Sequence, residues 1–234
     1  MMATSNESYP KLLSLAVHEF RTPASVVGGY LRMLLRDTDS PLTERQRKMI
    51  EEAEKSWAHI VELVAELGEV SKIDAGLITF AQQPLDVFSL VQEVAGTVHE
   101  SEDREIRLAV RGSTAGAPTI GDPARLKAAF QSIFRAILRE QPAACTVVAL
   151  RRIEDVGDLR SAVIVVAEET AVQDAYELEA GPFDEKRGGL GLMLPIARRV
   201  IEGHGGRLSA PIPAAGDQPT PNRGAAIISL PLRS

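Results

Sequence analysis

Apolar residues at alternating intervals of three and four constrain the fold of this chain most strongly. This spacing is typical of helices that pack along a heptad seam. The first run comprises Leu13, Val17, Phe20, Ala24, Val27, Leu31 and Leu34, and the second comprises Ile50, Ala53, Trp57, Ile60, Val64 and Leu67. We therefore predict two long helices joined by a short loop over residues 36–42, in an antiparallel hairpin.

Local signals support this hairpin but also mark weak points in it. Thr43 and Gln46 have the spacing of a capping box at the start of the second helix. Pro23 is expected to kink the first helix, because it lacks a backbone N–H and its ring clashes with the preceding turn. Gly28 and Gly29 weaken that helix further, each by ~1 kcal/mol relative to alanine.

An isolated hairpin would leave much of both apolar stripes in contact with water. Two hairpins can cover them by forming a dimeric four-helix bundle, which makes the protein a homodimer. Packing against the rest of the chain is the alternative, and the sequence leaves both open.

The composition changes after Gly76, where helical and strand patterns alternate. We predict helices over residues 88–98, 124–140 and 194–202, strands over 106–110, 146–150, 162–167 and 226–230, and a mobile loop over 211–223. Strands mixed with helices indicate an α/β sandwich. The predicted fold class is thus α+β, with a helical hairpin over residues 1–77 and an α/β domain over residues 83–234.

Composition excludes several classes of function. The net charge of −6 and the 4% aromatic content argue against a nucleic-acid-binding protein. No run of 18 apolar residues predicts a membrane span, and the polar start at Met1–Glu7 does not resemble a secretory signal. The single cysteine, Cys145, fits a reducing cytoplasm. The histidines His59, His99 and His204 lack metal-ligand spacing, so we predict no metal site.

The string His18-Glu19-Phe20-Arg21-Thr22-Pro23 is the strongest candidate for a chemical site. His18 follows a seam residue and is therefore expected on the flank of the helix, where a neutral imidazole can attack phosphorus. Glu19 can orient the ring and accept a proton. Thr22 lies on the same helical face as His18, and its hydroxyl can hold a water for hydrolysis of an acyl phosphate on a partner. A lone surface histidine is usually only solvated, but its five neighbours favour a functional box.

This string resembles the phosphoacceptor box of the two-component sensor histidine kinases, without a substitution. The later string Gly188-Gly189-Leu190-Gly191-Leu192, with His204-Gly205-Gly206 beyond it, is similar to the second glycine box of that family's GHKL-type ATPase domain. The resemblance implies His18 as phosphoacceptor and Gly189, Gly191 and Leu192 as remnants of a nucleotide site. Glycines there would let backbone N–H groups approach phosphates.

Two other family boxes depart from the pattern. Asp122-Pro123 resembles the start of the helix that carries the family's magnesium-binding asparagines, but their positions hold Ser132 and Ala136. The adenine-binding box lacks both glycines, and Glu168 or Glu169 is the candidate substitute for its aspartate. Loss of both sets of contacts would weaken nucleotide binding by on the order of a hundredfold.

Three hypotheses follow. The first is a phosphotransfer protein, resembling dimeric histidine phosphotransferases, that exchanges a phosphoryl group between His18 and the aspartate of a response regulator receiver domain, the Mg²⁺ coming with the partner. The second is an active histidine kinase, which would use ATP and Mg²⁺ as cofactors. The third is a non-catalytic dimeric adaptor that docks partners through the hairpin.

Overall fold

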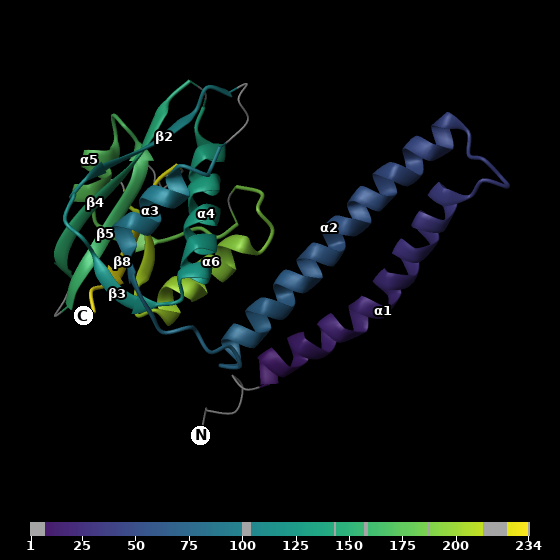
Figure 1. Ribbon diagram of the computed structural model, residues 1–234, viewed down its shortest axis with the longest axis horizontal. Coiled ribbons are helices and arrows are strands. Elements are labelled where there is room, and N and C mark those ends of the chain that lie inside the picture. Colours follow the sequence, from purple (N-terminus) through teal and green to yellow (C-terminus); the bar gives the residue numbers. More distant parts are fainter. Residues whose placement is uncertain are drawn as a thin grey trace. The chain divides into compact units, whose positions relative to one another are not determined.

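The computed structural model describes residues 8–99, 104–142, 144–156, 159–186, 188–212 and 224–233. Contacts between residues divide the chain into two units, Met1–Thr79 and Phe80–Ser234. The first contains two helices, and the second contains a sheet with helices on it (Figure 1). The predicted α+β class is confirmed.

The first unit is a helical hairpin, α1 (Ser8–Arg36) and α2 (Glu44–Asp74), as predicted. The predicted capping box is present: the backbone N–H of Gln46 donates to Thr43 Oγ1 at 3.3 Å, and the N–H of Thr43 donates to Gln46 Oε1 at 3.0 Å. After α2 the chain turns at Gly76, whose φ of +66° favours glycine. α1 continues through Pro23 as one helix.

Packing within the hairpin covers only part of the predicted seams. Phe20, Val27 and Ile60 remain 56%, 50% and 54% exposed. With neighbours from both helices they line an apolar groove, which we call the seam groove; its lining also includes Pro23, Ala24, Leu31, Ala53, Ser56 and Trp57. The sequence pattern therefore predicted more apolar surface than one hairpin buries.

A six-stranded sheet forms the centre of the second unit. Its strand order is β2-β4-β5-β8-β7-β6, and only the β2–β4 pair is parallel. These strands are β2 (Arg107–Gly112), β4 (Thr146–Val156), β5 (Leu159–Glu168), β6 (Ala180–Pro182), β7 (Arg207–Pro211) and β8 (Ala226–Pro231). A separate antiparallel pair consists of β1 (Gln83–Asp86) and β3 (Pro118–Gly121).

Helices lie on both faces of this sheet. One face carries α3 (Val87–Ala95), α4 (Pro123–Glu140) and α6 (Met193–Gly203), as Figure 1 shows. The other face carries the short α5 (Val172–Glu177), where Val172 and Ala175 pack on alternate residues of β5, including Val163 and Val165. The main core lies on the α4 side, where Phe130, Phe134 and Ile164 are fully buried.

All predicted helices and strands of the second unit exist, although several are longer than predicted. β4, for example, continues to Val156. The sequence analysis missed α5 and the short strands β1, β3, β6 and β7. Most of the predicted mobile loop over residues 211–223 lies outside the described residues, and Pro211 itself ends β7.

Candidate functional site

His18 presents its imidazole to solvent on the surface of α1. Its side chain is 79% exposed, and that of Glu19 is 72% exposed. The two are joined between His18 Nδ1 and Glu19 Oε1 at 3.4 Å. Because a carboxylate only accepts, this contact places the ring proton on Nδ1 and leaves the lone pair of Nε2 open to solvent. Thr22, one turn further along, is also exposed.

The backbone under His18 is anchored by the preceding residue. Val17 is buried, and a Cβ added at Gly68 of α2 would lie 3.3 Å from its Cγ1. Close to the start of α1, the hydroxyl of Ser71 donates to the carbonyl of Pro10 at 2.7 Å. These contacts hold the inner side of α1 on α2, so that His18 points away from the hairpin's own packing.

A second line of exposed apolar residues on α1 was missed by the sequence analysis. Val26, Tyr30 and Met33 are 52%, 64% and 67% exposed, and we call them the flanking stripe. Each of them precedes a seam residue by one position, which rotates the stripe by about 100° around the helix. The intervals of four and three between them were the available signal, but the stronger seam pattern beside them masked it.

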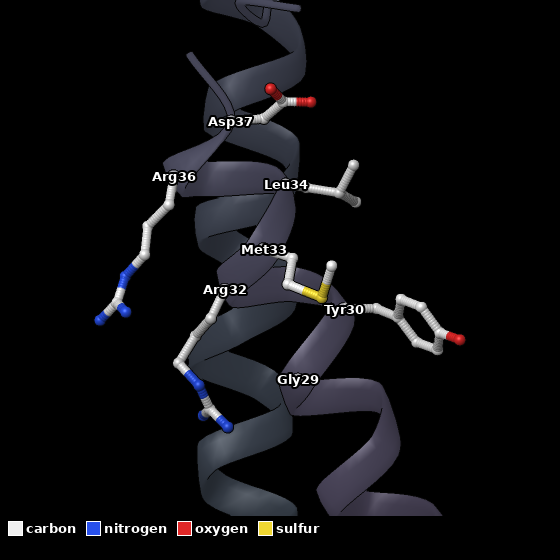
Figure 2. A pocket seen from close by; sticks show the side chains of 7 residues that line it. All are labelled: Gly29, Tyr30, Arg32, Met33, Leu34, Arg36 and Asp37. Carbon is white, nitrogen blue, oxygen red and sulfur yellow. The ribbon is translucent and has the colours of Figure 1, made fainter. Parts of the chain in front are cut away.

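Figure 2 shows the end of the flanking stripe near the turn of the hairpin. Tyr30, Met33 and Leu34 extend to one side of α1, whereas Arg32 and Arg36 extend to the other. The shallow surface depression here thus combines an apolar side with a basic side. Such a surface suits a protein partner better than a small ligand.

The glycine-rich loop in the second unit lies directly against α4. A Cβ added at Gly188 would lie 3.1 Å from both Cα and Cβ of Ala136, which is fully buried. Arg139 holds the same loop, because its Nη1 donates to the carbonyl of Gly188 at 3.1 Å and lies 3.4 Å from that of Gly189. The loop therefore occupies space beside the position of the second family asparagine.

Side chains at the other predicted nucleotide positions have partners within the protein. The hydroxyl of Ser132 donates to the carbonyl of Ala128 at 2.9 Å, within α4. Glu169 forms an ion pair with Arg111, and its backbone N–H donates to Thr146. The described residues contain no group of three or more His, Cys, Asp or Glu side chains placed to hold a metal ion.

The remaining glycines of the box keep a backbone that favours glycine. Gly189 and Gly191 have φ values of +58° and +59°, and Leu192 precedes the first residue of α6. These three residues therefore lie together just before the first residue of α6. Arg187, which precedes this glycine string, lies outside the described residues.

The start of α4 is a structural cap. Asp122 accepts hydrogen bonds from the backbone N–H groups of Arg125 and Ala81, both at 3.1 Å, and its own N–H donates to His204 Nε2 at 2.9 Å. Burial alone would raise the pKa of Asp122, but these hydrogen bonds lower it below its ordinary value. His204 in turn donates from Nδ1 to the carbonyl of Val200 at 2.7 Å, so it is a structural histidine.

Comparison with known proteins bears on both units. Residues 11–76 match the His Kinase A (phospho-acceptor) domain, a segment that includes His18, Glu19 and Thr22. The chain is 25% identical over 213 residues to the circadian input-output histidine kinase CikA of Synechococcus elongatus, and 26% identical over 205 residues to the sensor protein GacS of Pseudomonas syringae. Residues 11–76 therefore match the phospho-acceptor domain of histidine kinases, and most of the chain is similar to proteins of that family.

These alignments cover 87% and 82% of this chain but only 28% and 22% of CikA and GacS. The fold of the chain is also similar to a crystal structure of full-length ShkA in complex with AMPPNP, with a TM-score of 0.66 and 24% identity over 95% of this chain and 46% of ShkA. The histidine kinase AdeS of Acinetobacter baumannii gives a TM-score of 0.50 at 18% identity, over 93% of this chain and 98% of that one.

The predicted resemblance to the histidine kinases is therefore confirmed, and so is the fold that it implied. None of the helices in the described residues is long and apolar enough to span a membrane. The roles of His18, Glu19, Thr22, Gly189, Gly191 and Leu192 stay predictions, because similarity at this level concerns a domain and a fold and not the chemistry of single residues.

Proposed function

We propose that this chain is a phosphotransfer protein of two-component signalling, in which His18 exchanges a phosphoryl group with the aspartate of a response regulator receiver domain. The observation that carries the proposal is the exposed imidazole of His18, with Nδ1 facing the Glu19 carboxylate and Nε2 open to solvent. A nucleophile that reacts with a group on another protein must be accessible to that protein, and the exposed ring of His18 meets this requirement.

The transfer step follows from that tautomer. The lone pair of His18 Nε2 attacks the phosphorus of the receiver's aspartyl phosphate. A P–N bond forms as the P–O bond to the aspartate breaks, and the bonding electrons return to the aspartate as a carboxylate. The positive charge that develops on the imidazole is stabilised by Glu19, 3.4 Å from Nδ1. The reverse step uses the same atoms, and the Mg²⁺ that neutralises the phosphoryl oxygens belongs to the receiver domain.

Thr22 gives the same surface a second activity. Its exposed hydroxyl lies four residues beyond His18, on the same face of α1. It is placed to hold a water near the phosphorus of a docked aspartyl phosphate, which would hydrolyse that group instead of transferring it. Thr22 then acts in dephosphorylation and not in transfer.

The contacts around the glycine-rich loop support transfer without ATP. Ala136 offers no oxygen ligand for Mg²⁺, and Gly188 packs against it. The hydroxyl of Ser132 already donates within α4. A nucleotide with its metal would have to displace the loop and would gain no metal ligand from the side chain of Ala136.

We expect the working form to be a homodimer joined through the seam groove. Phe20, Val27 and Ile60 leave a continuous apolar surface that a second copy of the same surface would cover. The flanking stripe faces another direction and stays available to the receiver domain. Both surfaces are then used, by two different partners.

The test is transfer from phosphorylated receiver domains, screened one by one with purified protein. We expect at least one receiver to lose its label to His18 within minutes, and His18→Ala to gain none. If no receiver domain of the source organism transfers label to the wild-type protein or loses label faster in its presence, the proposal is wrong.

An active kinase is the second candidate, and the positive φ values of Gly189 and Gly191 favour it. Incubation with γ-labelled ATP and Mg²⁺ separates the two candidates. Label on His18 that is absent from His18→Ala would establish the kinase. The adaptor hypothesis instead requires that His18→Ala leave both partner binding and signalling output unchanged.

A further inference from the structure

A single tryptophan side chain of α2 is held by three consecutive turns of α1. The indole N–H of Trp57 donates to the carbonyl of Ala24 at 2.6 Å. A Cβ added at Gly28 would lie 2.1 Å from Cζ2 of the indole, so the ring rests on the backbone where only glycine leaves room. The guanidinium carbon of Arg32 lies 4.9 Å from the ring centroid. We call these contacts the Trp57 clamp.

The clamp begins at the residue that follows Pro23. A proline inside a helix removes one backbone hydrogen bond, here the bond to the carbonyl of Glu19, so α1 can pivot most easily at this point. Before Pro23, α1 is anchored on α2 where Val17 meets Gly68. After Pro23, the clamp supplies a specific polar contact between α1 and α2.

The two parts of the proposed receiver-binding surface lie on opposite sides of this pivot. His18 precedes Pro23, whereas the flanking stripe begins at Val26 and follows it. A receiver domain that docks on the stripe brings its aspartate to His18 correctly only if the two halves of α1 keep one orientation. Transfer is sensitive to such placement, because a shift of about 1 Å between reacting atoms can slow a reaction a hundredfold.

We propose that Trp57 is a positioning residue for phosphoryl exchange: its clamp fixes the flanking stripe relative to the imidazole of His18. This proposal rests on the proposed function, because it needs a receiver domain that meets both regions. It differs from a general role in stability, since it predicts that the reaction of His18 with a small phosphodonor does not depend on the clamp.

The experiment compares Trp57→Phe with Thr43→Ala in the full chain. Trp57→Phe keeps an aromatic ring on Gly28 but removes the N–H donor to Ala24. Thr43→Ala removes the capping box of α2 and so weakens the same hairpin without changing the clamp. For both variants the rate of transfer is measured at increasing concentration of a receiver domain that exchanges label with the wild-type protein.

The same proteins are treated with phosphoramidate, which needs no docking. In that reaction the lone pair of His18 Nε2 attacks the phosphorus of phosphoramidate, whose P–N bond breaks as the new P–N bond forms, and the protonated nitrogen of the donor leaves as ammonia. We expect Trp57→Phe to lower the maximal rate of transfer from the receiver by about tenfold, with little change in KM. Its phosphoramidate rate should equal that of the wild type, and Thr43→Ala should match the wild type in both reactions.

Gly28→Ala provides an independent variant, because its added methyl group must displace the indole. Trp57 is the only tryptophan of the chain, so its fluorescence reports this displacement directly. We expect a red-shifted emission maximum together with the same loss of transfer from the receiver.

The proposal is overturned if Trp57→Phe transfers at the wild-type rate, if Thr43→Ala loses as much activity, or if the phosphoramidate reaction slows equally. If the wild-type protein exchanges no phosphoryl group with any receiver, the proposed function fails and the positioning role fails with it. The wild-type control therefore distinguishes the two failures.

Discussion

The two units of this chain differ in how accessible their motifs are. The motif in the hairpin is exposed, whereas the motif in the α/β unit is packed against a helix. In the hairpin, the side chains of the phosphoacceptor box face solvent, and the contact between His18 and Glu19 leaves Nε2 open. In the α/β unit, the glycine box packs against α4, and Arg139 binds its carbonyl groups. The phosphoacceptor box is thus open to solvent in one unit, whereas the glycine box of the other unit is packed against protein atoms.

This difference shows that sequence similarity can predict the fold of a unit without predicting its chemical activity. Both units have a fold similar to that of solved histidine kinases, although the apolar core lies mainly in the second unit. Chemistry depends on a few polar atoms at the surface or in a pocket, and replacing one of them leaves the core unaffected. Fold and activity therefore have to be tested separately, unit by unit.

The most direct test of this contrast pairs one substitution in each unit. His18→Ala should abolish labelling of the protein by a phosphorylated receiver domain, because the substitution removes the nucleophile. Ser132→Ala, at the position of the first family asparagine, should leave the transfer rate unchanged. Labelling is followed by gel separation at fixed receiver concentration. A large loss of transfer in Ser132→Ala would contradict the contrast.

Restoring the second family asparagine should fail for a steric reason. Ala136→Asn adds a polar side chain where Gly188 leaves no space, so we expect a destabilisation of about 3 kcal/mol and no gain in binding of ATP with Mg²⁺. Urea unfolding and calorimetric titration measure the two effects. Ala128→Asn, on an exposed position of α4, is the matched control and should cost only about 0.5 kcal/mol.

An Ala136→Asn protein that kept its stability and bound the nucleotide with its metal would break the comparison. It would mean that the loop moves away from α4 easily, and that a single side chain separates this unit from a working nucleotide site. The active-kinase hypothesis would then gain the support that the packing of Gly188 against Ala136 now denies it.

Substitutions of two neighbouring glycines in α1 test whether the Trp57 clamp restricts the space beside the helix. Gly28→Ala should destabilise it by about 1–2 kcal/mol, because the methyl group meets the Trp57 ring. Gly29→Ala should stabilise it by up to about 1 kcal/mol, because a Cβ there has no neighbour within 4 Å and alanine favours the helix. Unfolding in urea, followed by Trp57 emission, measures both, and equal effects would show that the clamp has no steric basis.

These glycines also show what the sequence could and could not predict. Helix propensity alone treated Gly28 and Gly29 as equivalent weak points. The structure separates them, because the ring that rests on Gly28 comes from a residue 29 positions later in the other helix. Periodicity predicted both helices well, since it depends on local spacing, but a contact between helices depends on register and on which side chains meet.

The same limit applied in the second unit. Strong amphipathic patterns predicted α4 and α6, whereas β6 has three residues and no room for a pattern. The replaced asparagines were visible in the sequence because the family motif gave their positions. The contact between Gly188 and Ala136 was not, because it joins residues 52 positions apart through the fold.

Low pH should lower the stability of the two units to different extents, and this difference is the smallest effect that we predict. Among the described residues, the carboxyl groups with a lowered pKa are Asp86 and Asp122, which cap α3 and α4 of the second unit. For each, burial favours the neutral form, but hydrogen bonds from backbone N–H groups outweigh it. Because their pKa is lower in the folded state, they stabilise this unit above pH 3.8, the ordinary pKa, and that contribution is lost as the pH falls through the lowered value.

We therefore expect the second unit to lose structure at a higher pH than the hairpin. Circular dichroism at 222 nm reports both units, whereas Trp57 emission reports the hairpin alone, so the first signal should change before the second on acidification. Asp122→Asn can keep the hydrogen bond from Arg125 but not the second one from Ala81, since the amide nitrogen does not accept. It should lower stability at neutral pH by about 1 kcal/mol and flatten the acid dependence. Coincident acid transitions of the two signals in the wild type would instead mean that the units unfold together, and the contrast between them would then apply to their chemistry and not to their stability.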